Sequence, residues 1–549
     1  MNDIQGIDFS RLSQFENGFT RLYGDFINNF QQVKRFYRFD FRSLKSFRTA
    51  AEERSALYTH RELLADVLRE QNLDFGSSEK TMSNIELLRQ KNTVAIVTGQ
   101  QVGLFGGPLY TWYKIVTAIK LAHSLHEQLP EFSFVPIFWL EGEDHDFEEV
   151  NHINILNSDF QPVKLEYYPK GKRGQKNLSA VGNVTIDENI EMVVGELTKT
   201  LVPTEFKKDV VEKLQHSYAA GTTFNKAFAS YINLLTKDQG LIFIDANNRR
   251  LKDLVKPIFL KEIEEYPRVS QLIIQQSAEL EEHYHAQIKT KAMNVFLFHQ
   301  GGRYMLEPRE NDFSLRGSRQ HFTKDELLAL IQESPESVSP NVALRPVCQD
   351  TLLPTVAYIA GPSEVAYFAQ LRQVYEYFGC PYPVIYPRAS ATIVEEKQLK
   401  ILDKYQIGLP ELFENPGKIS KKVVDMVAEV KIDEMFTESS NQLNDTLNEL
   451  KFGLNYIDPT LLGSLETARE KIEATMHILK EKAGEAQQRK HEIAIRQIQK
   501  VQNILLPHEN FQERELNLSY FMNKYGSDFP AWLANELTID CFQHQFVYR

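Results

Sequence analysis

The sequence predicts an α/β protein with a parallel-sheet core, followed by a long helical region. A short β-branched run at 94–98 ends in Gly99, and Pro108 then opens an amphipathic helix that extends to residue 125. A second apolar run, 134–140, follows this helix. Strand, helix and strand in this order form a βαβ unit, which implies parallel strands joined by a right-handed crossover.

The same pattern recurs further along the chain. Strands are predicted at 240–245, 355–360 and 384–386, and helices at 248–265 and 363–378. Residues 1–90 are predicted to be helical. Two segments differ in composition from the strands and helices around them. One is rich in Lys and Gly at 169–174, which predicts a hairpin turn, and the other is predicted to form a hairpin that turns at Gly301 and Gly302. We take these segments as insertions, at about 153–235 and 290–335, into a core that spans residues 1–390.

The composition changes after residue 390. Residues 464–506 contain no proline, which predicts a helix on the order of 60 Å long. Apolar residues recur at every seventh position, as in one seam of a coiled coil: Leu465, Ile472, Leu479, Ala486 and Ile493. Together with a second helical stretch at 419–454, this predicts an antiparallel helical hairpin in a domain that spans residues 391–506. The tail, 507–549, is expected to pack back on the core.

Composition excludes several classes of protein. The chain has 549 residues with 62 Lys and Arg against 74 Asp and Glu, a net charge of −12, which argues against nucleic-acid binding. Three cysteines cannot form a disulfide framework or a cysteine-rich zinc site. The N-terminus lacks an apolar leader, and no stretch has the roughly 18 apolar residues of a membrane span. We expect a cytoplasmic protein with no metal and no membrane partner.

The glycine-rich turn at 99–107 is the first candidate site. Glycines let the backbone approach a ligand closely, and the helix that follows offers free N–H groups, so the turn suits phosphate or carboxylate. A tight strand–helix connection without a ligand is the alternative. The position at the carboxyl end of a parallel strand favours function. The candidate binding residues on the turn and the helix are Gly99, Gln100, Gln101, Gly103, Gly107, Tyr110, Thr111 and Lys114.

The acidic run after the second strand is the next candidate, and it contains Glu141, Asp144 and His145. So many acids at one strand end must meet cations, donors or water. Three interpretations remain open: a helix cap with a solvated face, a metal site, and a site for a substrate ammonium or amine. We favour the last, because the spacing of the histidines and acids matches no standard zinc motif.

Two further polar clusters follow predicted strands. Gly361, Ser363, Glu364 and Tyr367 come after 355–360, and Ser363 is also a good helix N-cap. Arg388, Ser390 and Thr392 come after 384–386. An arginine there suits bidentate binding of phosphate or carboxylate.

Five ordered blocks of the sequence resemble the bacillithiol biosynthesis cysteine-adding enzymes, a family of cysteine ligases. The blocks are TGQQVGLFGGPLYTWYK (98–114), VPIFWLEGEDHDFEEVNH (135–152), LRPVCQDTLLPTVAYIAGPSEVAYFAQL (344–371), PRASAT (387–392) and LPHENFQER (506–514). The resemblance implies a Rossmann-like core similar to class I aminoacyl-tRNA synthetases, with inserted connecting-peptide elements. It also implies a C-terminal coiled-coil domain that supports a homodimer.

The implied reaction is the last step of bacillithiol synthesis, in which cysteine is joined to glucosaminyl-malate through an amide. ATP would activate the cysteine carboxylate. The turn, through Gly99, Gln100, Gln101, Gly103 and Gly107, would hold the nucleotide. Arg388, with Ser390 and Thr392, would stabilise phosphate charge. Glu141 and Asp144 would bind an ammonium or sugar hydroxyls, and His145 would take the proton from the attacking amine.

Two other functions compete with this interpretation. One is a metal-dependent hydrolase or amidase that uses the GEDHD cluster at 142–146. The other is a non-catalytic partner that docks another enzyme of the pathway through its helices.

Overall fold

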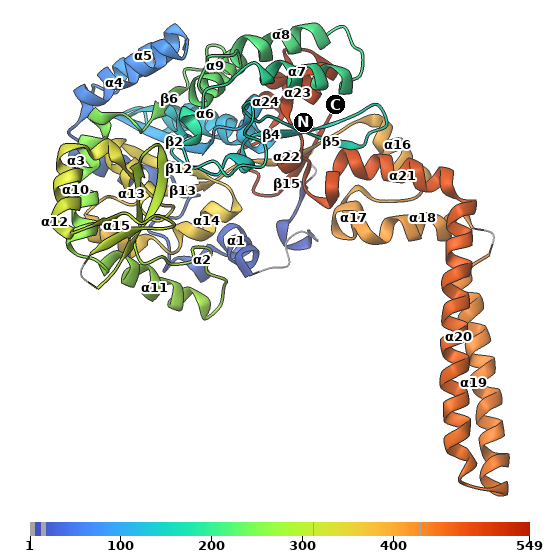
Figure 1. Ribbon diagram of the computed structural model, residues 1–549. Helices are drawn as coiled ribbons and strands as arrows, with labels where there is room; N and C mark the ends of the chain where they lie inside the picture. Colours follow the sequence, from blue (N-terminus) through green and yellow to red (C-terminus); the bar gives the residue numbers. More distant parts are fainter. Residues whose placement is uncertain (1–5, 13–17, 311, 429) are drawn as a thin grey trace. The chain divides into compact units, whose positions relative to one another are not determined.

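The computed structural model describes residues 6–12, 18–310, 312–428 and 430–549. The N-terminal residues 1–5, on which the expectation of no leader partly rests, lie outside the described residues. The chain forms two compact units (Figure 1). The first, called unit 1 below, comprises residues up to Ile393 together with Asn510–Val547. Unit 2 comprises Val394–Glu509 with the last two residues.

Unit 1 is built around a five-stranded sheet in the order β13-β12-β2-β3-β6, in which every paired strand is parallel. The chain starts in the middle of the sheet, proceeds outward to one edge, and then returns to the other side of β2. The strands are β2 (Thr93–Gln101), β3 (Ser133–Glu141), β6 (Ile242–Asp245), β12 (Thr355–Ala360) and β13 (Val384–Pro387). The strand order therefore reverses between β2 and β12, and the predicted parallel α/β core is confirmed.

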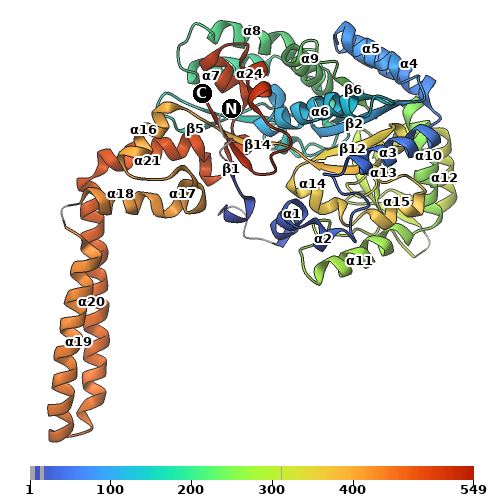
Figure 2. The same ribbon diagram turned by 180° about the vertical axis from the view of Figure 1, so that it is seen from behind.

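Burial explains why these segments form strands. Residues 93–99 of β2 and all of β12 are buried, which is typical of parallel strands covered on both faces. Helix α6 (Leu109–Gln128) packs on β2, β3 and β12, as the predicted crossover requires. Helix α3 (Leu44–Leu57) packs on β2, β12 and β13, and Figure 2 shows it beside β12.

Smaller sheets surround this core. An antiparallel sheet has the order β10-β9-β8-β7-β11, a hairpin pairs β4 with β5, and a third sheet has the order β1-β15-β14. Their bounds are β1 (Gly6–Ile7), β4 (His152–Leu156), β5 (Pro162–Glu166), β7 (Val295–His299), β8 (Gly302–Pro308), β9 (Phe313–Leu315), β10 (His321–Phe322), β11 (Val338–Pro340), β14 (Ser390–Val394) and β15 (His544–Tyr548).

The two predicted hairpins have different outcomes. The turn at Gly301 lies between β7 and β8, as the sequence predicts. The hairpin in the first insertion turns at 157–161 instead of 169–174, because the Asn157 side chain accepts hydrogen bonds from the backbone N–H groups of Asp159 and Gln161, both at 2.9 Å.

Helices fill the rest of unit 1. They are α1 (Gly18–Asn28), α2 (Phe30–Val33), α4 (Arg61–Asp74), α5 (Glu79–Leu87), α7 (Asn189–Thr200), α8 (Lys207–Ser217), α9 (Phe224–Thr236), α10 (Arg249–Glu264), α11 (Arg268–Glu281), α12 (Lys324–Glu333), α13 (Arg345–Leu352), α14 (Pro362–Phe368), α15 (Arg372–Phe378), α22 (Gln512–Glu515), α23 (Leu518–Tyr525) and α24 (Phe529–Glu536). The single helix predicted at 363–378 is wrong: α14 and α15 are separated at Gln370. The Gln370 side chain is bonded to the backbone of Ile288 and to Ser277.

Unit 2 contains α16 (Glu396–Lys404), α17 (Leu409–Glu414), α18 (Ile419–Val427), α19 (Ile432–Ile457), α20 (Leu461–Lys490) and α21 (Glu492–Leu505). Helices α19 and α20 lie side by side as a helical hairpin, as predicted (Figure 1). The helix predicted at 464–506 is interrupted at His491. None of the helices in the described ranges is long and apolar enough to span a membrane.

The seven-residue seam predicted on α20 is only partly buried. Leu465 is buried, whereas Leu479 is 55% exposed, and Ile493, which lies beyond the interruption on α21, is 78% exposed. A strict seven-residue repeat drifts by about 20° per heptad on a straight helix, so its later members rotate away from α19. Arg469 faces α19, where it donates to Asn444 and Asn448.

The C-terminal segment of unit 1 seals the glycine-rich turn. The Asn517 amide donates to the carbonyls of Phe105 and Gly107, at 3.0 and 2.6 Å, and its oxygen caps α23 at Ser519. On the other side, the Tyr218 hydroxyl contacts the Gly103 carbonyl and the Gly106 N–H. Residues 102–107 are consequently buried in protein.

We predict that Asn517→Ala destabilises the protein by about 2 kcal/mol or more, because it removes the partners of two buried carbonyls and a helix cap. Thermal unfolding followed by circular dichroism measures the effect. Asn535→Ala, at an exposed position on α24, is the control and should change stability by no more than about 0.5 kcal/mol. Equal unfolding curves for the two variants would show that the segment does not hold the turn.

Candidate functional site

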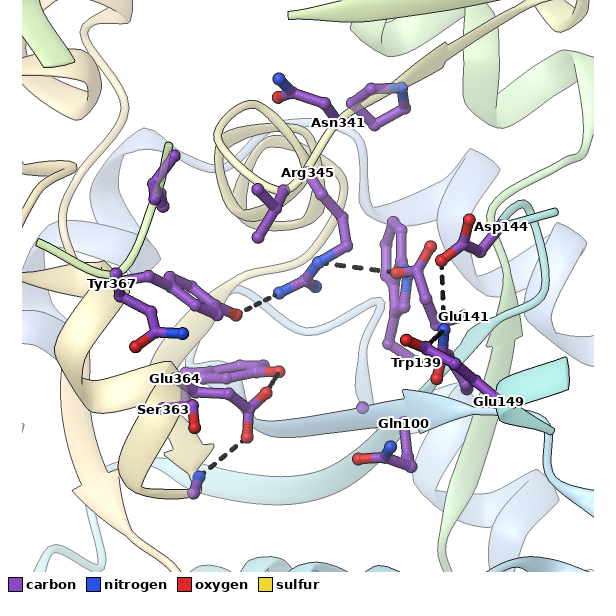
Figure 3. Close-up of a pocket in the computed structure, with 18 of the residues that line it drawn as sticks. Gln100, Trp139, Glu141, Asp144, Glu149, Asn341, Arg345, Ser363, Glu364 and Tyr367 are labelled. Atoms are coloured by element: carbon purple, nitrogen blue, oxygen red, sulfur yellow. Dashed lines mark hydrogen bonds and ion pairs between the residues drawn. The ribbon is translucent and has the colours of Figure 1, made fainter. Parts of the chain in front are cut away.

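A cavity of about 720 Å³ lies at the carboxyl edge of the parallel sheet, where the strand order reverses. This is the position at which open α/β sheets bind ligands. Strands β2, β3 and β12 and helices α6 and α14 form its floor, and the antiparallel sheet and α13 contribute further side chains (Figure 3). All of its lining residues belong to unit 1.

The cavity brings together most of the residues predicted from the sequence. Those that line it are Gly99, Gln100, Gln101, Tyr110, Lys114, Glu141, Asp144, Gly361, Ser363, Glu364, Tyr367 and Arg388. They come from four segments that are far apart in the chain, and each follows or adjoins the end of a parallel strand. The parallel topology therefore accounts for their convergence.

The remaining predicted residues do not line this cavity. Gly103, Gly107 and Thr111 lie in or beside the sealed turn, where Gly106 and Gly107 adopt positive φ and a Cβ on Gly103 would be 2.9 Å from the Gly107 Cα. The glycines thus serve a compact backbone turn. Only the first three residues of the predicted anion-binding turn face the cavity, which corrects the expectation for the others.

Ser390 and Thr392 also face the protein interior. The Ser390 hydroxyl donates to the Glu513 carboxylate at 2.9 Å, and both hydroxyls contact the His544 ring, at 2.8 and 2.9 Å. Arg388 donates to Glu513 at 2.6 Å and still lines the cavity. The expected phosphate cradle of Arg388, Ser390 and Thr392 is therefore reduced to Arg388, because the two hydroxyls are used by buried partners from the C-terminal segment.

Lys114 joins the two sides of the cavity floor. Its ammonium contacts the Gly99 carbonyl at 2.9 Å, the Gln100 side-chain oxygen at 3.0 Å and the Glu364 carboxylate at 2.5 Å. Glu364 also accepts from the Tyr358 hydroxyl and the Gly361 N–H. Burial lowers the pKa of Lys114, although the Glu364 charge opposes this effect. All three donors of Lys114 are used, so it positions β2 against α14.

The carboxylates of the acidic run pair with different cations. Glu141 lies 3.5 Å from Arg345 and accepts from the Trp139 indole at 3.0 Å. Glu143 points away from the cavity and forms a buried ion pair with Lys252 at 2.5 Å. Asp144 contacts Arg303 at 3.1 Å and accepts from Gln101. In the described ranges, no three His, Cys, Asp or Glu side chains are grouped so that they could hold a metal ion.

Two of the carboxylates that line the cavity, Glu141 and Asp144, have opposite electrostatics. Burial raises the pKa of Glu141 to about 7, with Arg345 opposing and the nearby Glu143 and Asp144 adding to the rise. Burial also acts to raise the pKa of Asp144, but hydrogen bonds from His145 and the Arg303 charge outweigh it and hold that pKa well below its usual range. Near neutral pH, Asp144 is a fixed anion and Glu141 can exchange a proton.

His145 lies behind this wall. Its Nδ1 is 3.3 Å from the Arg303 guanidinium and 3.3 Å from Asp144, and its ring contacts Phe296. Arg303 and Phe296 line the cavity, whereas His145 is outside its lining residues.

Several cations in the cavity were missed by the sequence reasoning. Arg303 stacks on Phe296 and is held by Ser339 and the Pro340 carbonyl, while Arg345 donates to Tyr367 and Gln349. Lys289, Lys291 and Arg514 also line the cavity, and in the described part of the chain their side chains form no ion pair. Arg345 and Arg514 lie inside blocks 344–371 and 506–514, so those blocks were the available signal; nothing in the sequence marks Arg303.

We predict that Glu141→Gln raises thermal stability in a pH-dependent manner. Between pH 4.5 and 7 folded wild type binds more protons at Glu141 than the unfolded chain, so its stability falls as pH rises through this window. The variant has no carboxyl group to ionise at this position, so it avoids the loss in free energy of unfolding, which is on the order of 2–3 kcal/mol above pH 7. Melting curves at pH 4 and pH 8 should therefore show a gain for the variant, of about 1–3 °C, at pH 8 only. A pH-independent difference would contradict the raised pKa.

Comparisons with known proteins agree with this architecture. The sequence model described as "Bacillithiol biosynthesis BshC, N-terminal Rossmann-like domain" matches residues 7–389, and that of the BshC C-terminal coiled-coil domain matches residues 391–549. A protein from Salinibacter ruber named "Putative cysteine ligase BshC" is 39% identical over 96% of both chains. Proteins of the same name from Chloroherpeton thalassium (34%; 98% of this chain and 99% of the relative) and Chlorobaculum tepidum (35%; 97% of both) also match. The chain therefore belongs to the BshC family of bacillithiol biosynthesis.

Proposed function

We propose that the protein is a cysteine ligase, which joins cysteine to glucosaminyl-malate through an amide bond in the last step of bacillithiol synthesis. Family membership supports this proposal, as does the name shared by the relatives. The observation that carries it is the charge pattern of the cavity, in which carboxylates and uncompensated cations face the same space at the carboxyl edge of the sheet.

The proposed substrates match that charge pattern. Cysteine carries one ammonium and one carboxylate, and glucosaminyl-malate carries an amine and two carboxylates. Asp144 and Glu141 provide negative charge for an ammonium, and Lys289, Lys291 and Arg514 provide positive charge and form no ion pair with the described residues. Guanidinium and ammonium groups in a partly enclosed site bind carboxylates by charge-assisted hydrogen bonds. A cavity of about 720 Å³ also falls within the usual size of small-molecule sites.

Amide formation from a carboxylate requires activation, and we assign this role to ATP. When bound, ATP would supply the activation of the cysteine carboxylate by adenylation, with loss of pyrophosphate. The residues that fit it are Gly99 and Gln100, whose backbone lies at the end of β2, and the two arginines Arg388 and Arg514. Arg388 is fixed by Glu513, so its guanidinium is preorganised to stabilise negative charge.

We expect purified protein to convert cysteine and glucosaminyl-malate to bacillithiol only when ATP is present, with one AMP formed per product. Mass spectrometry of paired reactions with and without ATP measures both. Arg514→Gln removes a free cation from the cavity and should raise the KM for glucosaminyl-malate or for ATP about tenfold or more. Lys199→Gln, at an exposed position on α7, is the matched control and should leave both values unchanged.

Each other outcome of this assay contradicts a distinct part of the proposal. Product without AMP would retain the ligase and reject ATP as the activator. No product from folded wild type would reject the ligase and favour a non-catalytic role. A KM that stays within twofold for both substrates of the Arg514 variant would exclude Arg514 from binding.

We also propose that the protein is a homodimer through unit 2. Helix α19 exposes large apolar side chains near its C-terminal end, with Phe452 80% and Tyr456 94% exposed. Such a strip is costly in water and suits burial against a second copy. Light scattering should give twice the 63.5 kDa chain mass for wild type and for Glu473→Gln, and the monomer mass for Phe452→Asp combined with Tyr456→Asp. A monomeric wild type would overturn this assignment.

A further inference from the structure

Glu141 occupies a distinctive place among the carboxylates of the cavity. It is the last residue of β3, and its carboxylate is held by the Trp139 indole N–H at 3.0 Å and by the Arg345 guanidinium at 3.5 Å (Figure 3). The Arg345 terminal nitrogens are directed to Tyr367 and Gln349, at 2.8 and 2.9 Å. Arg345 therefore compensates the Glu141 charge only in part.

Two other carboxylates of the cavity, Asp144 and Glu364, have more partners than Glu141. Asp144 is bonded to Arg303 and Gln101, and Glu364 is bonded to Lys114, Tyr358 and the Gly361 N–H. Glu149 accepts from Gln101 at 2.7 Å and is exposed at the mouth. A carboxylate that is stabilised by several donors is a weak base, so Asp144 and Glu364 are poorly suited to accept a proton from a substrate.

The charged groups around Glu141 come from each neighbouring element: Glu143 and Asp144 on the loop after β3, Arg303 on β8, Arg345 on α13, and, across the floor, Lys114 on α6 with Glu364 on α14. Burial and the two nearby acids raise the pKa of Glu141 to about 7, against the opposing effect of the two arginines. This pKa is near that of an amine group with an ordinary pKa of about 8, so proton transfer between them is nearly balanced.

We propose that Glu141 is the proton acceptor for the attacking amine, and this assignment rests on the ligase function proposed above. The Glu141 carboxylate takes one proton from the ammonium of the amine substrate. The nitrogen lone pair then forms the C–N bond to the activated cysteinyl carbonyl, and the C–O bond to the leaving group breaks with its electron pair. The second proton lost from nitrogen passes to solvent or the leaving group, which completes the neutral amide.

Position distinguishes Glu141 from the histidine that the resemblance put forward. Glu141 faces the cavity, whereas His145 lies behind Arg303 with its Nδ1 directed at that guanidinium. A proton acceptor must come within hydrogen-bond reach of the proton it removes, and Glu141 meets this requirement without rearrangement of the wall.

The test compares Glu141→Gln, His145→Gln and the control Glu148→Gln, which makes the same amide change at an exposed position of the acidic run. We expect Glu141→Gln to lower the kcat for amide formation at pH 7 by about 10²–10⁴-fold. Cysteine-dependent exchange of pyrophosphate into ATP, which precedes amine attack, should stay within threefold. Glu148→Gln should match wild type in both assays.

The pH profile separates a base from a structural role. Wild-type kcat should fall as pH drops below about 7, as Glu141 becomes protonated, and in Glu141→Gln this limb should move up to the pKa of the amine, about 8. The variant should regain activity above pH 8, where the free amine is already deprotonated. Glu141→Asp, which keeps a carboxylate, should recover part of the lost rate.

Each contrary result is specific. A Glu141→Gln rate within threefold of wild type, or an unchanged acid limb, overturns the assignment. Loss of the limb in His145→Gln alone transfers the role to His145. Wild type that forms no amide rejects the ligase function itself, and this failure is distinguishable because no variant is needed to see it.

Discussion

The buried ammonium of Lys114 is the contact on which the cavity depends. The strand order reverses between β2 and β12, so the connections leave these strands in different directions and a crevice opens at their ends. Lys114 spans this crevice with bonds to Gly99, Gln100 and Glu364. A lysine ammonium has three donors, and all three are used here. The end of β2 and the start of α14 are therefore held at a fixed separation, and the cavity floor is preorganised.

In the walls of the cavity and just behind them, most charged side chains are paired. Most carboxylates have a dedicated cation or set of donors, as in the pairs of Asp144 with Arg303 and Glu143 with Lys252. Such pairs in a poorly solvated interior keep their charge and direction. Glu141, Lys289, Lys291 and Arg514 are exceptions, because their charges are only partly compensated or not paired within the described ranges. The groups left available are those assigned to substrates.

The sequence was a good guide to the core of the fold. The strand at 94–98, the helix at 108–125 and the strand at 355–360 were predictable because burial on both faces gives continuous apolar runs between clear end signals. The division at Gln370 was not predictable, because the side chains that hold it, Ser277 and the backbone at Ile288, are distant in the sequence.

The site was predictable only where topology alone determines position. Gln100 and Glu141 lie at the ends of parallel strands and Ser363 follows one, so they had to gather at one edge of the sheet. The orientation of a side chain was not predictable in this way. Nothing in the sequence near Ser390 or Thr392 shows that their hydroxyls bond to Glu513 and His544. Likewise, the glycines at 103 and 107 look like a ligand loop in sequence, but Asn517 closes them off.

The bonds between Ile393 and Gln512, at 2.8 and 3.2 Å, give the chain an order of assembly. The chain leaves unit 1 and re-enters it at neighbouring points, so unit 2 is an insertion that the ribosome completes before the last segment of unit 1. Until that segment emerges, Arg388 lacks the carboxylate of Glu513, and an isolated buried charge is costly. A chain that ends before residue 513 lacks both the partner of Arg388 and the Arg514 side chain of the cavity. The part of the cavity that contains Arg514 is therefore the last to be synthesised.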